Sequence, residues 1–114
     1  MEKDSIYLKH TLDAIAVVEG YVEGIDSISF QEHKNKLIQD GVIREIEIIG
    51  EAAKNLSTDF KDSHNGIPWK KIMSMRDRLI HEYFGVDLEA VWQTVQEDLP
   101  KLKTQVGEML SEIS

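Results

Sequence analysis

The chain has 114 residues, of which 41% are hydrophobic and 30% are charged. These values are typical of a globular domain with one hydrophobic core and argue against a disordered chain. The absence of cysteine excludes disulfides, thiolate metal sites and a cysteine nucleophile. The formal net charge of −8 argues against nonspecific nucleic-acid binding, which needs clustered Lys and Arg, so no DNA partner is expected.

No segment of the sequence predicts a signal peptide or a membrane span. The first ten residues are charged and lack an apolar core. No apolar run approaches the roughly 20 residues needed to cross a bilayer. We therefore expect one domain over residues 1–114, located in the cytoplasm and without a membrane partner.

The first half of the chain predicts two long helices, because apolar residues recur there at helical spacing. The first is expected over residues 4–23, with Gly24 as its C-terminal cap. Ser29 and Glu32 have the spacing of a capping box and predict the start of a second helix that continues to Leu56. Residues 57–66 are expected to form a polar loop.

The second half predicts two or three further helices. Pro68 is suited to the first position of a third helix over residues 68–84. Asp87 can cap a fourth helix that begins at Leu88. Pro100 either kinks that helix or begins a fifth one capped by Asp98. No strand is predicted, and the fold class expected is an all-α up-and-down bundle of four to five helices.

The third predicted helix carries the basic region of this acidic chain. Residues 64–80 hold Lys70, Lys71, Arg76 and Arg78 against Asp77 alone. Lys70, Lys71 and Arg78 are therefore candidate contacts to an RNA backbone.

Arg76 occupies an unexpected position on this helix. At roughly 100° per residue, it falls at the midline of an apolar side. The apolar residues of that side are Trp69, Ile72, Met73, Leu79, Ile80 and Tyr83. A guanidinium there is costly unless it is paired or lies at a second interface. Asp77 and His81 fall along one flank beside it, over roughly 7.5 Å of helix.

These polar residues are sufficient for cleavage of RNA without a metal or a cofactor. Arg76 can hold a phosphate, and His81 can exchange a proton near neutral pH. Asp77 can orient the His81 ring or hold Arg76. The 2′-hydroxyl would attack the adjacent phosphorus while His81 moves protons and Arg76 stabilises the developing charge. No pair of histidines has the spacing of a metal site.

Purely structural explanations remain open for each of these residues. Arg76 can be the salt-bridge partner of an acidic residue of the second helix: Glu45, Glu47 or Glu51. His81 can be a structural histidine, and Tyr83 a core aromatic with its hydroxyl at the edge.

The segment from Arg76 to Tyr83, RDRLIHEY, matches the pattern Arg-x4-His-x-Tyr. Together with residues 41–57, 67–87 and 92–102, it resembles the HepT-like branch of the HEPN superfamily over essentially the whole chain. The resemblance implies a helical bundle that forms a homodimer, with two copies of the motif facing one shared cleft.

The resemblance also implies a function. Members are similar to endoribonuclease toxins encoded beside a minimal nucleotidyltransferase antitoxin. It implies that Arg76 and His81 are catalytic and that the partner silences the toxin by transferring AMP to Tyr83. Asp77 stands at a position that is usually polar, while no role is implied for Arg44 or Glu51.

Two functional hypotheses from different classes follow. The first is a metal-independent ribonuclease toxin that acts as a homodimer on RNA. The alternative is a noncatalytic nucleotide- or partner-binding module that regulates a nucleotidyltransferase, which the net charge of −8 favours. A purely structural helical dimer is a third possibility, although it does not need His81 and Tyr83 beside Arg76.

Overall fold

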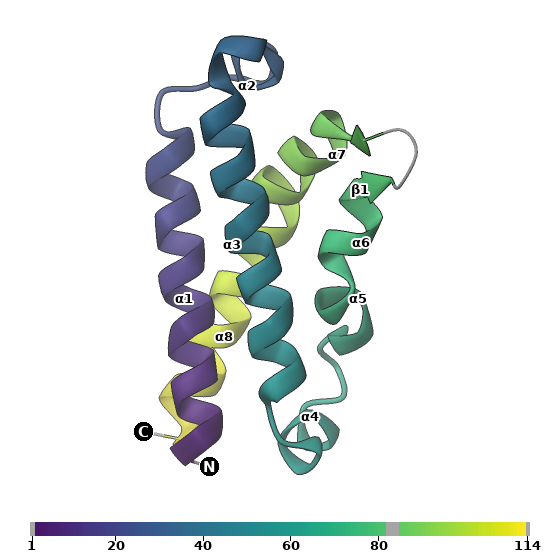
Figure 1. The fold of residues 1–114 in the computed structure, drawn as a ribbon. Coiled ribbons are helices and arrows are strands. Elements are labelled where there is room, and N and C mark those ends of the chain that lie inside the picture. Colours follow the sequence, from purple (N-terminus) through teal and green to yellow (C-terminus); the bar gives the residue numbers. More distant parts are fainter. Residues whose placement is uncertain (1, 82–84, 114) are drawn as a thin grey trace.

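A computed structural model describes residues 2–81 and 85–113. Helices α1 (Glu2–Val22) and α3 (Lys36–Asn55) lie side by side and antiparallel, and α8 (Leu99–Ile113) crosses behind them (Figure 1). The short helices α5 (Trp69–Met73) and α6 (Met75–Leu79) pack along the other side of α3. The expected all-α bundle is confirmed.

The core lies where these helices meet. It consists of residues with almost no exposed surface: Leu8, Ile15, Val18, Phe30, Val42, Ile46, Ile49, Phe60, Met75, Val91, Leu99 and Val106. They recur at three- and four-residue spacing within each long helix, as an amphipathic helix requires. Every buried side-chain nitrogen and oxygen of the described residues has a hydrogen-bond partner.

Two predicted helix boundaries are confirmed. Gly24 follows α1 with a positive φ of 76°, a conformation that glycine adopts without steric cost. Asp87 caps α7 (Leu88–Gln93) because its side chain accepts a hydrogen bond from the Ala90 N–H at 3.0 Å.

The predicted capping box at Ser29 is wrong. The cap is Asp26, whose carboxylate accepts from the Ser29 N–H at 2.8 Å and begins α2 (Ser27–Gln31). The chain then leaves the helix at Glu32 and forms the 3₁₀ turn η1 (His33–Asn35) before α3 begins. The buried Gln39 amide donates to the Phe30 and Glu32 carbonyls at 2.8 and 3.0 Å, so the break leaves these two groups paired.

The predicted loop over 57–66 contains a helix, α4 (Thr58–Ser63). The Ser57 hydroxyl caps it by accepting from the Phe60 N–H at 3.1 Å. The almost fully buried carboxylate of Asp4 accepts from the N–H and the hydroxyl of the same serine, at 2.7 and 2.9 Å. Asp4 thereby ties the start of α1 to the turn between α3 and α4.

The predicted third helix over 68–84 is interrupted and shorter. At Ser74 the backbone departs from helical geometry (φ −106°, ψ 13°), and the Ser74 hydroxyl bonds to the Lys70 carbonyl at 2.9 Å. Helix α6 then ends at Leu79, and β1 (Ile80–His81) pairs antiparallel with β2 (Gly85–Val86). The expectation of no strand is therefore wrong for this small ribbon, which the bond from the Asp87 N–H to the Leu79 carbonyl closes at 2.8 Å.

Pro100 is the second residue of α8, and the chain reaches it without leaving right-handed helical geometry. Between α7 and α8 the chain forms the π-helical segment η2 (Thr94–Asp98), in which the Leu99 N–H bonds to the carbonyl of Thr94, five residues earlier. Pro100 lacks an N–H and would clash with the carbonyl four residues before it in a regular helix. The wider π-helical turn leaves room for the proline ring. Because the chain is already helical at Asp98, this residue does not cap α8.

Replacing Asp4 by Ala is expected to lower the free energy of unfolding by about 1–3 kcal/mol, because the Ser57 N–H and hydroxyl lose a buried acceptor. Urea denaturation followed by circular dichroism measures this loss. The control is Asp13→Ala on the exposed side of the same helix, where a change of about 0.5 kcal/mol or less is expected. Equal losses in both variants would contradict the role of Asp4.

Candidate active site

The candidate site forms where α3 packs closely against α5. Gly50 of α3 faces the α5 backbone: a Cβ there would lie 3.3 Å from the Met73 carbonyl oxygen and 3.5 Å from that of Ile72. A larger side chain would push the two helices apart. Glu47 lies one turn before Gly50 on α3 and therefore also faces the α5–α6 segment.

Arg76 of α6 reaches across this contact to Glu47. Its Nε lies 2.7 Å from Glu47 Oε2, and its side chain is 44% exposed. The placement of Arg76 at the midline of a buried face is wrong, because the residues that α5 and α6 bury are Ile72, Met75 and Leu79. Arg76 lies at the edge of that buried side, where water and α3 are both within reach.

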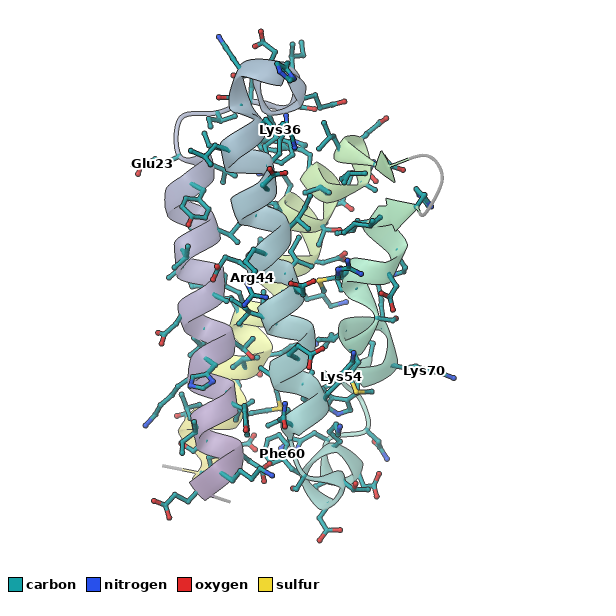
Figure 2. The ribbon with its side chains drawn as sticks, in the orientation of Figure 1. Glu23, Lys36, Arg44, Lys54, Phe60 and Lys70 are labelled. Atoms are coloured by element: carbon teal, nitrogen blue, oxygen red, sulfur yellow. The ribbon has the colours of Figure 1, made fainter. Side chains whose placement is uncertain are left out.

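The carboxylate of Glu47 is shared between two arginines. Its Oε1 accepts a hydrogen bond from Arg44 Nη1 at 2.8 Å, while Oε2 faces Arg76. The hydrogen bond from Arg44 and the positive charges of Arg76 and Arg44 lower the pKa of Glu47, although partial burial opposes the shift. Glu47 is therefore an anion held between two cations. Figure 2 labels Arg44 on α3.

Asp77 and His81 do not share a flank with Arg76 as predicted. Helix α6 ends at Leu79, so His81 lies on β1 and not on the helix. No hydrogen bond or ion pair joins Asp77 to His81, and the polar neighbour of Asp77 is Arg76, with Nη1 and Oδ1 3.7 Å apart. Of the two roles expected for Asp77, the geometry fits holding Arg76, although Asp77 is 71% exposed.

His81 presents an exposed imidazole. Its Cα is paired with that of Gly85 in the two-stranded ribbon, which fixes the backbone at this point. Within the described residues, no side-chain hydrogen bond or ion pair engages the His81 ring. Tyr83, the predicted site of AMP transfer, lies outside the described residues.

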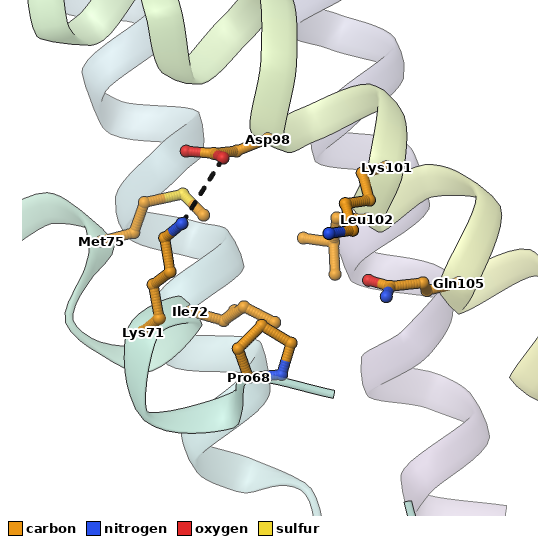
Figure 3. A pocket seen from close by; sticks show the side chains of 8 residues that line it. All are labelled: Pro68, Lys71, Ile72, Met75, Asp98, Lys101, Leu102 and Gln105. Atoms are coloured by element: carbon orange, nitrogen blue, oxygen red, sulfur yellow. Dashed lines mark ion pairs between the residues drawn. The ribbon is translucent and has the colours of Figure 1, made fainter. Parts of the chain in front are cut away.

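The side chains of Lys70, Lys71 and Arg78 point in different directions. Lys71 points toward the end of η2, where its Nζ lies 3.7 Å from an Asp98 carboxylate oxygen beside a small pocket of about 60 Å³ (Figure 3). Lys70 extends from α5 away from α3 (Figure 2), and Arg78 is exposed on α6. The structure thus does not bring the basic side chains of residues 64–80 together on one surface.

The described residues contain no group of three or more His, Asp or Glu side chains placed to hold a metal ion. None of the described helices combines the length and apolar character of a membrane span.

The sequence pointed to Glu47 only as one of three acidic candidates and gave Arg44 no role. The three-residue spacing of Arg44 and Glu47 was the available signal, because residues three apart meet on a helix surface. What the spacing cannot show is that Glu47 also faces another helix.

The pKa of Glu47 tests this arrangement. A carbon-detected NMR titration of the side-chain carboxyl should give a pKa below the ordinary glutamate value in the wild type and a higher pKa in Arg44→Gln. Because the folded-state pKa is lowered, the stability from these ion pairs should be present above the unfolded-state pKa and lost as the pH falls through the folded-state pKa. An unchanged pKa in Arg44→Gln would contradict the assignment of Arg44 as the main cause.

Comparison with known proteins identifies the family. A family profile described as "Ribonuclease HepT-like" matches residues 11–109. A Methanocaldococcus jannaschii protein named "Gamma-glutamylcyclotransferase and putative RNase" is 46% identical over 99% of this chain, which spans half of that protein. The "Probable ribonuclease HepT" of Thermococcus cleftensis is 47% identical over 85% of this chain and 86% of its own length.

A "Putative RNase" of Caldanaerobacter subterraneus subsp. tengcongensis is 43% identical over 91% of both chains. No solved structure matches. The family match covers most of the chain, and the chain belongs to the HepT-like ribonuclease family.

Proposed function

We propose that this protein is a metal-independent endoribonuclease that cuts RNA by attack of a 2′-hydroxyl on the adjacent phosphorus. The observation that carries the proposal is that exposed Arg76 and His81 occur together in a member of a ribonuclease family. Both side chains are exposed, on consecutive elements. The terminal nitrogens of Arg76 form no hydrogen bond with other described residues, and their ion-pair neighbour is the exposed Asp77, 3.7 Å from Nη1. One offers a fixed positive charge and the other a proton carrier near neutral pH.

The reaction needs only these two kinds of group. His81 takes the proton of the 2′-hydroxyl as the oxygen bonds to phosphorus, and an imidazolium gives a proton to the departing 5′-oxygen. The guanidinium of Arg76 stabilises the charge on the non-bridging phosphoryl oxygens. The products are a 2′,3′-cyclic phosphate and a free 5′-hydroxyl.

The proposal includes a homodimer, in which two copies of the Arg76 and His81 pair face one cleft. The family resemblance and the exposure of both side chains support it. A second copy would supply a second imidazole, so that one His81 accepts a proton while the other donates one.

The proposal also includes a nucleotidyltransferase antitoxin that transfers AMP to Tyr83. Tyr83 is two residues beyond His81 in the sequence. AMP on its side chain would therefore add bulk and negative charge near the proposed catalytic histidine. The RNA phosphate and the AMP phosphate would repel each other where Arg76 must act.

Purified protein is expected to cut RNA in the presence of EDTA, to leave 2′,3′-cyclic phosphate ends and to do so as a dimer by light scattering. Replacing His81 by Ala should lower kcat by about 10²- to 10⁴-fold, because a general acid–base is lost. Gel electrophoresis of labelled RNA with end-group analysis by mass spectrometry measures both results.

His33→Ala is the matched control, because His33 is an exposed histidine on η1, before α3, and outside the Arg76–Glu47 contact. This control should cut RNA at the wild-type rate. The enzyme proposal fails if His81→Ala and the wild type cut RNA equally well.

Tyr83→Phe is expected to cut RNA like the wild type but to accept no AMP from a nucleotidyltransferase encoded beside this protein. The phenylalanine ring has no oxygen to bond to the adenylyl phosphorus. Mass spectrometry after incubation with the transferase and ATP should show added AMP on the wild type and none on the variant. AMP found on Tyr7 or Tyr21 instead would contradict the assignment.

A noncatalytic partner-binding module is the second candidate function, favoured by the ion pair of Arg76 with Glu47. A guanidinium already paired with a carboxylate is less available to a substrate phosphate. This function predicts AMP transfer to the protein without RNA cleavage.

A further inference from the structure

We propose that Glu47 is a positioning residue for Arg76, and that Arg44 holds Glu47 in place for this task. The inference rests on the proposed ribonuclease function and extends it to two residues outside the Arg76–His81 motif. Glu47 is not a catalytic group, because it acts on the substrate only through the guanidinium of Arg76.

The side of the guanidinium that Glu47 contacts supports this role. Glu47 Oε2 lies 2.7 Å from Nε, which is the side of the group nearest the chain. The Nη1–Nη2 edge can bind two phosphate oxygens at once. It forms no hydrogen bond with residues 2–81 or 85–113, and its nearest acidic group is the exposed Asp77, with Oδ1 3.7 Å from Nη1. Glu47 thus orients the guanidinium from the Nε side and does not itself occupy the Nη1–Nη2 edge.

Glu47 is itself anchored twice. Arg44 donates to Oε1 at 2.8 Å, so each carboxylate oxygen contacts a different arginine. Gly50, one turn along α3, holds the helix against the α5 backbone, with 3.3 Å between an added Cβ and the Met73 carbonyl oxygen. The position of the carboxylate relative to α6 is therefore set by a side-chain contact and by a backbone contact.

An exposed arginine needs such support to be effective in a transition state. Its long side chain samples many rotamers in water. If it becomes ordered only in the transition state, the loss of conformational entropy adds to the activation free energy. A carboxylate that holds it beforehand removes part of this cost. Arg44, Glu47 and Arg76 together carry one net positive charge, which the exposed carboxylate of Asp77, 3.7 Å from Arg76 Nη1, offsets in part.

The competing explanation is a latch, in which Glu47 blocks Arg76 and the substrate must displace it. The two roles predict opposite results for Glu47→Gln. A positioning residue gives a slower variant, whereas a latch gives a faster or tighter-binding one. The contact at Nε favours positioning, since a latch would cover the Nη1–Nη2 edge.

The experiment is steady-state cleavage of a labelled RNA by full-length wild type, Glu47→Gln, Arg76→Ala and the double variant. Glu47→Gln should lower kcat by about 10- to 100-fold with little change in KM, since a misdirected guanidinium fails mainly in the transition state. In the Arg76→Ala background the same change should have no further effect, because Glu47 acts through Arg76. Glu47→Asp should recover part of kcat.

The matched control is Glu51→Gln, one turn along the same helix, where the carboxylate pairs with Lys54 at 3.3 Å. This variant should retain the wild-type kcat. Urea unfolding of each variant separates a loss of positioning from a loss of fold, because a folded Glu47→Gln with wild-type kcat overturns the inference.

A faster Glu47→Gln, or an equal loss of kcat in both Arg76 backgrounds, overturns it as well. If the wild type cuts no RNA at all, the proposed function fails and the inference fails with it. Failure of the inference alone therefore appears only with an active wild type.

Discussion

The close approach of α3 to α5 is the contact on which the candidate site depends. It exists because Gly50 has no side chain, so the backbone carbonyls of the neighbouring helix can lie within van der Waals distance of the position that a Cβ would take. The short separation lets the side chain of Glu47 reach a helix other than its own. The interruption at Ser74 then decides which residues of the next turn face the core. Met75 is buried and Arg76 lies beside it at the surface, next to Glu47.

The parts of the fold that the sequence predicts well are those encoded by local chemistry. The helical period, the Asp87 cap and the glycine after α1 each depend on residues close together in the chain, and all three agree with the structure. The wrong helix boundaries occur where a side chain bonds to a residue far away in the sequence, which no local motif reveals. The Gln39 amide allows the chain to leave the helix near Glu32, and Asp4 meets its serine partner from 53 residues away. Neither pairing has a pattern that periodicity can detect.

The placement of the candidate site residues shows the same limit. The motif places Arg76 and His81 five residues apart in the chain, and the projection at 100° per residue requires one continuous helix through both. The Ser74 interruption and the end of α6 at Leu79 invalidate that angle, so the flank shared with His81 does not exist. The two explanations considered for Arg76, a salt bridge or a catalytic role, were treated as alternatives. The geometry at Nε makes them compatible, because the ion pair with Glu47 does not occupy the Nη1–Nη2 edge of the guanidinium.

Under the proposed function, the charged groups next to the site matter more for an RNA substrate than the net charge of the protein. At physiological ionic strength, exposed charges separated by more than about 8 Å are largely screened, so a net charge of −8 acts weakly on a phosphate already at the site. What matters there is the immediate set of groups, and the basic side chains are divided among separate partners, with Lys71 near Asp98 and Arg44 and Arg76 sharing Glu47. Such a surface gives little nonspecific attraction to the RNA backbone. Binding must then come from a few oriented contacts, and this favours RNA whose shape brings one phosphate to Arg76 over RNA in general.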